Sequence, residues 1–153
     1  MLLSCFTGLA FSDIKQLAPE HIVTDMQGHR WIRKPRRKTG NMCNIPLLKI
    51  PEEILKRYRT DPECLAHNVL LPVTSNQKMN VYLKELADIC GIRKNLSTHC
   101  ARHFFATYTL ANGVSIESVA KMLGHSDTKM TRHYAKVLDQ TILREMSKSP
   151  EEF

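Results

Sequence analysis

The sequence predicts a mainly α-helical domain with a small antiparallel three-stranded β-sheet near its N-terminus. Beyond residue 50, apolar residues recur at helical spacing, as in 76–90 and 98–112. Between residues 21 and 48, three short β-prone runs alternate with glycine-containing turns. The 153 residues, of which 42% are hydrophobic, suffice for one well-formed core and fit a single domain.

The sheet is expected from runs at 21–24, 30–37 and 42–48. Met26-Gln27-Gly28 turns the chain between the first two runs, and Thr39-Gly40-Asn41 turns it between the second and the third. Short turns of this kind join antiparallel neighbours. The expected helices are 12–17 (begun by Ser12 or Asp13), 51–59, 76–90, 98–112, 116–123 and 128–134 (capped by Asp127), with a further candidate at 139–148.

The composition narrows the class of partner. A formal net charge of +7 favours a polyanion, nucleic acid before a membrane surface. No run approaches the roughly 20 apolar residues of a membrane span. The apolar first eleven residues lack the basic start of a signal peptide, so we expect no membrane partner.

The cysteines and histidines do not form a pattern typical of a metal site. Five cysteines are scattered without a CxxC pair, which argues against a disulfide framework and favours a reducing cytoplasm. Cys64 with His67, and His99 with His103, each offer two ligands without the second pair that structural zinc needs. We therefore expect neither a metal nor a cofactor.

A basic hairpin is the first candidate for a functional surface. One interpretation is a charged edge strand that deters aggregation. A cluster without a compensating acid exceeds that need, so we favour contacts with DNA phosphates. Its six basic residues are Arg30, Arg33, Lys34, Arg36, Arg37 and Lys38.

Four further residues are weak signals taken singly. His99 and Arg102 share one face at the start of a helix, where orphan amides already favour an anion. His125 follows Leu123-Gly124 at a helix end, where a histidine often only complements the helix dipole. Tyr134 by itself reads as a core aromatic.

Together, these residues resemble the tyrosine recombinase (phage-type integrase) family, in the order H-x-x-R, L-G-H, Y. Tyr134 lies nine residues after His125, and the spacings from Arg102 to His125 and to Tyr134 match those of the family. Thr7-Gly8-Leu9 before Ser12-Asp13 is similar to the family's first motif, and Lys38-Thr39-Gly40 before Ile45-Pro46-Leu47 is similar to its β-hairpin lysine. The resemblance covers nearly the whole chain and implies the family's catalytic-domain fold.

The resemblance also implies a reaction. Tyr134 would attack a DNA phosphate to give a 3′-phosphotyrosine and a free 5′-hydroxyl, without metal or ATP. His99 would act as the base, and Lys38 as the acid for the leaving oxygen. Arg102 and His125 would hold the non-bridging oxygens.

One position departs from the family pattern. The first catalytic arginine usually follows T-G-L directly, and this chain has Ala10 there. We expect Arg36 to take its place, because residues two apart on a strand share a face and Arg36 would point with Lys38 into the site. Arg37 or Arg33 would serve if a bulge shifts the register. In lacking the first arginine, the chain resembles integrases of mobile elements in Bacteroidetes-like bacteria. This resemblance favours integration or excision as the biological reaction.

The family implies double-stranded DNA as the partner and a homotetramer in the full-length protein. Residues 1–153 would form the catalytic domain without the amino-terminal core-binding domain, a monomer that binds DNA weakly. The segment after Tyr134 would pack on its own core or on a neighbouring subunit. The alternatives are a non-catalytic DNA-binding relative, a type IB topoisomerase-like enzyme and a helical protein-interaction domain.

Overall fold

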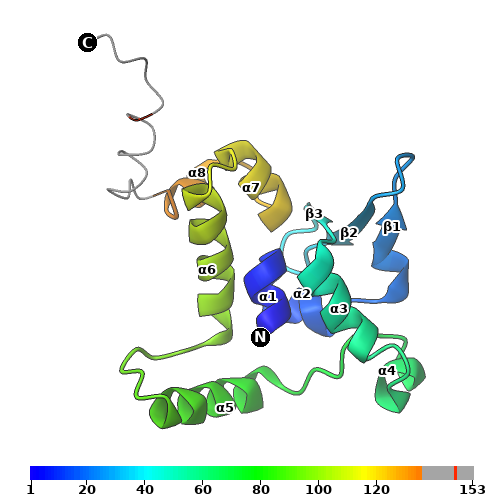
Figure 1. The fold of residues 1–153 in the computed structure, drawn as a ribbon, viewed down its shortest axis with the longest axis vertical. Helices are drawn as coiled ribbons and strands as arrows, with labels where there is room; N and C mark the ends of the chain where they lie inside the picture. The colour runs from blue at the N-terminus through cyan, green and yellow to red at the C-terminus, as the bar shows by residue number, and fades with distance from the viewer. Residues whose placement is uncertain (136–146, 148–153) are drawn as a thin grey trace.

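The computed structural model describes residues 1–135 and 147, and Figure 1 shows how their elements are arranged. The elements are α1 (Leu2–Thr7), α2 (Phe11–Lys15), a 3₁₀ turn (Pro19–His21), β1 (Ile22–Thr24), β2 (Arg30–Pro35), β3 (Met42–Pro46), α3 (Lys49–Arg57), α4 (Pro62–Ala66), α5 (Asn76–Ile89), α6 (Thr98–Ala111), α7 (Ile116–Leu123) and α8 (Lys129–Arg132).

The predicted three-stranded antiparallel sheet is confirmed, with the order β1-β2-β3. Its register places Ile32 opposite both Ile22 on β1 and Ile45 on β3. Ile32 and Ile45 are almost completely buried, so this face of the sheet packs on the core. The last two strands are shorter than expected and end at Pro35 and Pro46, where proline withholds a backbone donor.

Two apolar clusters hold the domain together. The larger one joins the sheet to α1, α2 and α3 around Leu9, Leu17 and Ile32, and the smaller one joins α6 to α7 around Phe105 and Leu123. Helix α1 contacts both α3 and α6, and Figure 1 shows it between them. This central helix therefore links the two halves of the core.

Two helices, α1 and α4, were not predicted. Six residues are too few for a helix to be stable alone, so α1 owes its structure to packing on α3 and α6. The predicted cap of α2 is wrong, because α2 begins after Ala10. The Asp13 carboxylate is buried and accepts the backbone N–H of Arg37 instead (2.9 Å).

Helices α5, α6 and α7 follow their expected bounds within one residue, but α8 is shorter than expected: it begins after Thr128 and ends at Arg132, before Tyr134. Ser115 caps α7 through its hydroxyl, and α7 ends at Gly124 in the left-handed conformation (φ +62°). Asp127 accepts the backbone N–H of Lys129 at the start of α8. The candidate helix at 139–148 lies outside the described residues, apart from residue 147. Among the described residues, no helix is long and apolar enough to cross a membrane.

Candidate active site

Arg102 is the buried centre of a cationic cluster. It lies in the second turn of α6 and is only 3% exposed. Its Nη1 donates to the carbonyl of Gly8 (2.6 Å) and its Nη2 to the carbonyl of Leu123 (2.7 Å). Burial, and then the charge of Arg36, lower the pKa of Arg102, but an arginine side chain stays charged in proteins. The ends of α1 and α7 thus fix a full positive charge in the core.

His125 stands beside this guanidinium, directly after the last turn of α7. Its Nε2 lies 3.2 Å from Nη2 of Arg102, and its Nδ1 lies 2.8 Å from the hydroxyl of Thr131. Burial and the neighbouring Arg102 and Arg36 lower the pKa of His125 to about 4. At neutral pH the ring is therefore uncharged.

Arg36 reaches the same place from the β2–β3 hairpin. The inward face of this strand continues from Ile32 through Lys34 to the half-buried Arg36. Nη1 of Arg36 lies 3.5 Å from the carbonyl of Gly124, and within the described part of the chain its buried Nε has no hydrogen-bond partner. The side chains of Arg36, Arg102 and His125 therefore meet at the end of α7, and these three residues form the cationic cluster.

Gly124 makes this meeting possible. A Cβ at this position would lie 2.7 Å from Cδ of Arg36 and 2.8 Å from Sγ of Cys43. Cys43 is completely buried, and burial raises the pKa of its thiol to about 11, so it acts here as an uncharged filler under Arg36.

Tyr134 lies in the turn that follows α8 and is half-buried against the α6–α7 cluster. Its ring is parallel to that of His125, with centroids 6.4 Å apart, and meets the edge of His103 at 4.8 Å. Its backbone N–H donates to the carbonyl of Thr131 (3.0 Å). The phenol ring is therefore held at the border of the cationic cluster.

Among the described residues, the ring of His99 does not contact the ring of Tyr134. His99 is exposed at the start of α6, and its ring packs on His103 with centroids 4.5 Å apart. His103 thus stands between His99 and Tyr134. Partial desolvation by its neighbours, and then His103 and Arg102, lower the pKa of His99, which favours its neutral, proton-accepting form.

Among the described contacts, no hydrogen bond or ion pair joins the remaining basic residues of the hairpin to this cluster. Arg33, Arg37 and Lys38 are exposed, and Lys38 stands in the turn between β2 and β3. Lys34, one of the residues expected to contact DNA phosphates, is only 5% exposed, and its Nζ lies 3.4 Å from Nε2 of His21. A lysine on the inward face of a strand next to the core is buried with that face.

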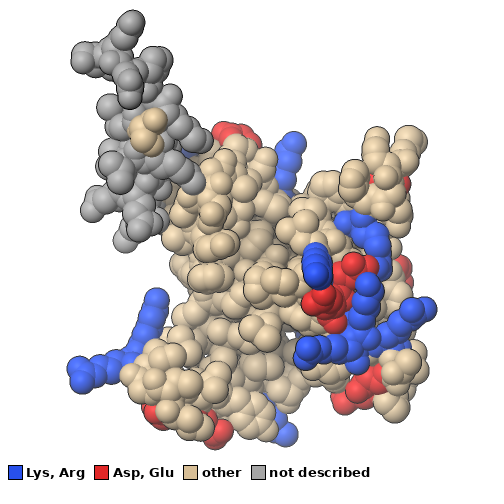
Figure 2. Space-filling view, viewed as in Figure 1, with Lys and Arg blue, Asp and Glu red and all other residues tan. Residues whose placement is uncertain are grey.

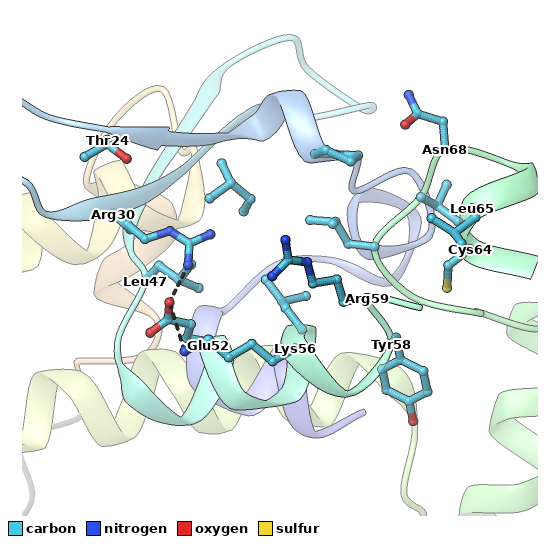
Figure 3. Close-up of a pocket in the computed structure, with 15 residues that line it drawn as sticks. Thr24, Arg30, Leu47, Glu52, Lys56, Tyr58, Arg59, Cys64, Leu65 and Asn68 are labelled. Carbon is cyan, nitrogen blue, oxygen red and sulfur yellow. Dashed lines mark hydrogen bonds and ion pairs between the residues drawn. The ribbon is translucent and has the colours of Figure 1, made fainter. Parts of the chain in front are cut away.

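Arg30 forms an ion pair with Glu52, which also holds Lys56 (Figure 3). These side chains line a pocket of about 580 Å³ between the sheet and helices α3 and α4. In Figure 2, basic side chains over this part of the molecule are interspersed with acidic ones. The residues of the cationic cluster do not line this pocket.

Sequence reasoning missed four contributors to the site. Asp13 anchors the hairpin through Arg37, the Gly8 carbonyl receives Arg102, Thr131 holds His125, and Cys43 underlies Arg36. Gly8 and Asp13 belong to the motif that resembles the family's first motif, so the sequence indicated these residues but not the groups that they contact. Thr131 and Cys43 carry no local signal.

Residues 1–141 match the model of the phage integrase family, and the chain belongs to this family. Among curated relatives, it is 41% identical over 100 residues to a tyrosine recombinase of Pseudothermotoga lettingae, covering 63% of this chain and 35% of that protein. It is 36% identical over 88 residues to the tyrosine recombinase XerD of Staphylococcus aureus, covering 58% and 29%. The chain thus spans about a third of the length of these relatives.

Solved structures share the fold at lower identity. The XerH site-specific recombinase, in a post-cleavage complex with palindromic difH substrate, has a TM-score of 0.74 at 20% identity, covering 95% of this chain and 43% of that one. The XerA recombinase has a TM-score of 0.72 at 20% identity, covering 99% and 57%. The Tn1549 transposon integrase bound to circular intermediate DNA has a TM-score of 0.72 at 18% identity, covering 97% and 57%.

Proposed function

We propose that the protein cuts and rejoins double-stranded DNA at specific sites through a covalent intermediate on Tyr134. The observation that carries this proposal is the convergence of Arg36, Arg102 and His125 on the end of α7, with the Tyr134 ring beside His125. A phenol next to fixed guanidinium cations suits nucleophilic attack on a phosphodiester.

Each step follows from this arrangement. The Tyr134 oxygen forms a bond to phosphorus while the bond from phosphorus to the 5′-oxygen breaks, leaving a 3′-phosphotyrosine. During this displacement, extra negative charge develops on the non-bridging oxygens of the pentacoordinate phosphorus, and the planar forks of Arg102 and Arg36 match two of them. Arg36 supplies the second guanidinium that Ala10 does not. Attack by a 5′-hydroxyl of another strand reverses the step, so the bond energy is kept and no ATP is consumed.

Two proton transfers complete the reaction. Tyrosine has a reference pKa of about 10, so Tyr134 must give its proton to a base during attack. His99 is assigned this role, with His103 lying between the two rings. Lys38 is assigned as the acid that protonates the leaving 5′-oxygen, which requires the DNA to lie against the exposed hairpin turn.

The biological setting is part of the proposal. Exposed Arg33 and Arg37 would contact the DNA backbone near the site. Residues 1–153 would form the catalytic domain of a cytoplasmic bacterial protein that acts as a homotetramer on two duplexes. The transposon integrase with the same fold supports integration or excision of a mobile element as the event.

The test is a covalent-trapping assay. The chain, at high concentration, is mixed with a pool of duplexes that carry a nick near a randomised sequence, so that the short cut piece diffuses away. We expect an SDS-resistant protein–DNA adduct that Tyr134→Phe abolishes and that Arg102→Ala and Arg36→Ala reduce by about 10²- to 10³-fold each.

Arg93→Ala is the matched control, since it removes an exposed arginine outside the hairpin and should leave trapping nearly unchanged. An adduct that survives Tyr134→Phe would refute the assigned nucleophile. Full activity of Arg36→Ala would refute its role as the second guanidinium. Plasmid relaxation without sequence preference would instead indicate a topoisomerase-like enzyme.

A further inference from the structure

Thr131 is a buried hydroxyl residue that touches both sides of the candidate site. It lies on α8 and is completely buried. Its hydroxyl lies 2.8 Å from Nδ1 of His125, and its carbonyl accepts the backbone N–H of Tyr134 (3.0 Å). One residue therefore holds a histidine of the cationic cluster through its side chain and the nucleophile through its backbone.

The donors around His125 determine which ring nitrogen carries the proton. The guanidinium of Arg102 has only donors, so at 3.2 Å the facing Nε2 of His125 must accept. In the neutral ring the proton then resides on Nδ1 and is donated to the Thr131 hydroxyl, which has lone pairs to receive it. Without that hydroxyl, a buried N–H would be left unpaired, at a cost that favours another tautomer or another ring orientation.

We propose that Thr131 is a positioning residue that fixes the tautomer and orientation of His125, keeps the accepting Nε2 directed at the guanidinium of Arg102, and holds Tyr134 in register with that ring. The proposal deepens the proposed function, because it assigns how one group of that site is held. It concerns the hydroxyl specifically, since any residue at position 131 would supply the backbone carbonyl that accepts the N–H of Tyr134.

Thr131→Val tests this directly, because valine keeps the shape and the backbone bond and removes only the hydroxyl. In ¹⁵N NMR spectra at pH 7, with His125→Gln used to assign the signals, we expect His125 of the unaltered chain to carry its proton on Nδ1. Thr131→Val should shift the population toward Nε2–H. Thr131→Ser, which restores a hydroxyl, should return it toward Nδ1–H.

The trapping assay gives the functional arm. Thr131→Val should slow adduct formation by about 10- to 100-fold, as is common when the partner that orients a functional histidine is lost. Thr131→Ser should recover most of this rate. Thr7→Val, which removes another fully buried threonine hydroxyl, should lower thermal stability yet leave the His125 tautomer unchanged, and so separates positioning from loss of stability.

The inference is overturned if His125 of the unaltered chain carries its proton on Nε2, if Thr131→Val leaves both tautomer and trapping rate unchanged, or if Thr131→Ser is as impaired as Thr131→Val. If the unaltered chain forms no adduct, the proposed function fails. The NMR measurement still decides the role of Thr131 in that case.

Discussion

Replacing Gly124 by alanine would test how closely the hairpin and α7 are fitted around Arg36. The backbone at Gly124 is left-handed (φ +62°), which costs an L-residue about 1–2 kcal/mol. The new Cβ would also lie 2.7 Å from Cδ of Arg36 and 2.8 Å from Sγ of Cys43. Overpacking of this kind costs about 1–3 kcal/mol when the neighbours cannot move.

Gly91→Ala is the matched control. Gly91 has nearly the same conformation (φ +64°), but a Cβ there meets nothing within 4 Å. Both variants should therefore lose about 1–2 kcal/mol of unfolding free energy in urea titrations from the backbone alone. The Arg36 side chain is flexible and would yield first, so the additional loss in Gly124→Ala should fall at the low end of the overpacking range.

The larger difference should appear in covalent trapping. Displacing Arg36 would remove a positioned cation, and such a loss costs up to about 10²- to 10³-fold in rate. Gly124→Ala should approach the rate of Arg36→Ala, whereas Gly91→Ala should trap DNA at the rate of the unaltered chain. Equal trapping rates for the two alanine variants, at equal folded fractions, would refute the idea that Gly124 admits Arg36 to the site.

Three further predictions follow from the same structure. The pKa of His125 in the folded state is lowered to about 4 from its usual value near 6.5, so the folded state binds fewer protons than the unfolded state. The free energy of unfolding should therefore fall as the pH drops from 6.5 toward 4, and His125→Gln should make this pH dependence less steep in urea titrations. Identical slopes for the variant and the unaltered chain would contradict the shift. Asp13→Ala should lower the free energy of unfolding by about 1–3 kcal/mol, because the backbone N–H of Arg37 loses its acceptor. Asp13→Asn keeps an acceptor oxygen and should cost less. The reverse order would exclude this hydrogen bond as the cause. Arg33→Ala should reduce the slope of log affinity for duplex DNA against log salt by about one. Arg30→Ala should reduce this slope by less, because the guanidinium of Arg30 is already paired with Glu52 on α3. Equal reductions would show that the Arg30–Glu52 ion pair breaks when DNA binds.

Much of the fold was predictable because its signals are local. The sheet follows from turn residues and β-prone runs, and α5, α6 and α7 follow from helical spacing of their apolar residues. Helix α1 escaped prediction because its six residues are stabilised by α3 and α6 rather than by their own propensity. Asp13 was misjudged for a related reason: its carboxylate could cap a helix locally, but a hairpin amide 24 residues away receives it instead.

The order and spacing of His99, Arg102, His125 and Tyr134 were determined by the sequence alone, because such motifs are local and fix the residue types. Which basic side chain stands beside Arg102 was decided only by the tertiary structure. Arg36 and Gly124 lie 88 positions apart in the chain, and their contact exists only because the hairpin and α7 pack together. Other tertiary contacts bury Lys34 beside His21, and the packing of α8 on α7 brings the hydroxyl of Thr131 to His125. A local pattern specifies the direction of a side chain from its own strand or helix, whereas its partner depends on how distant elements meet.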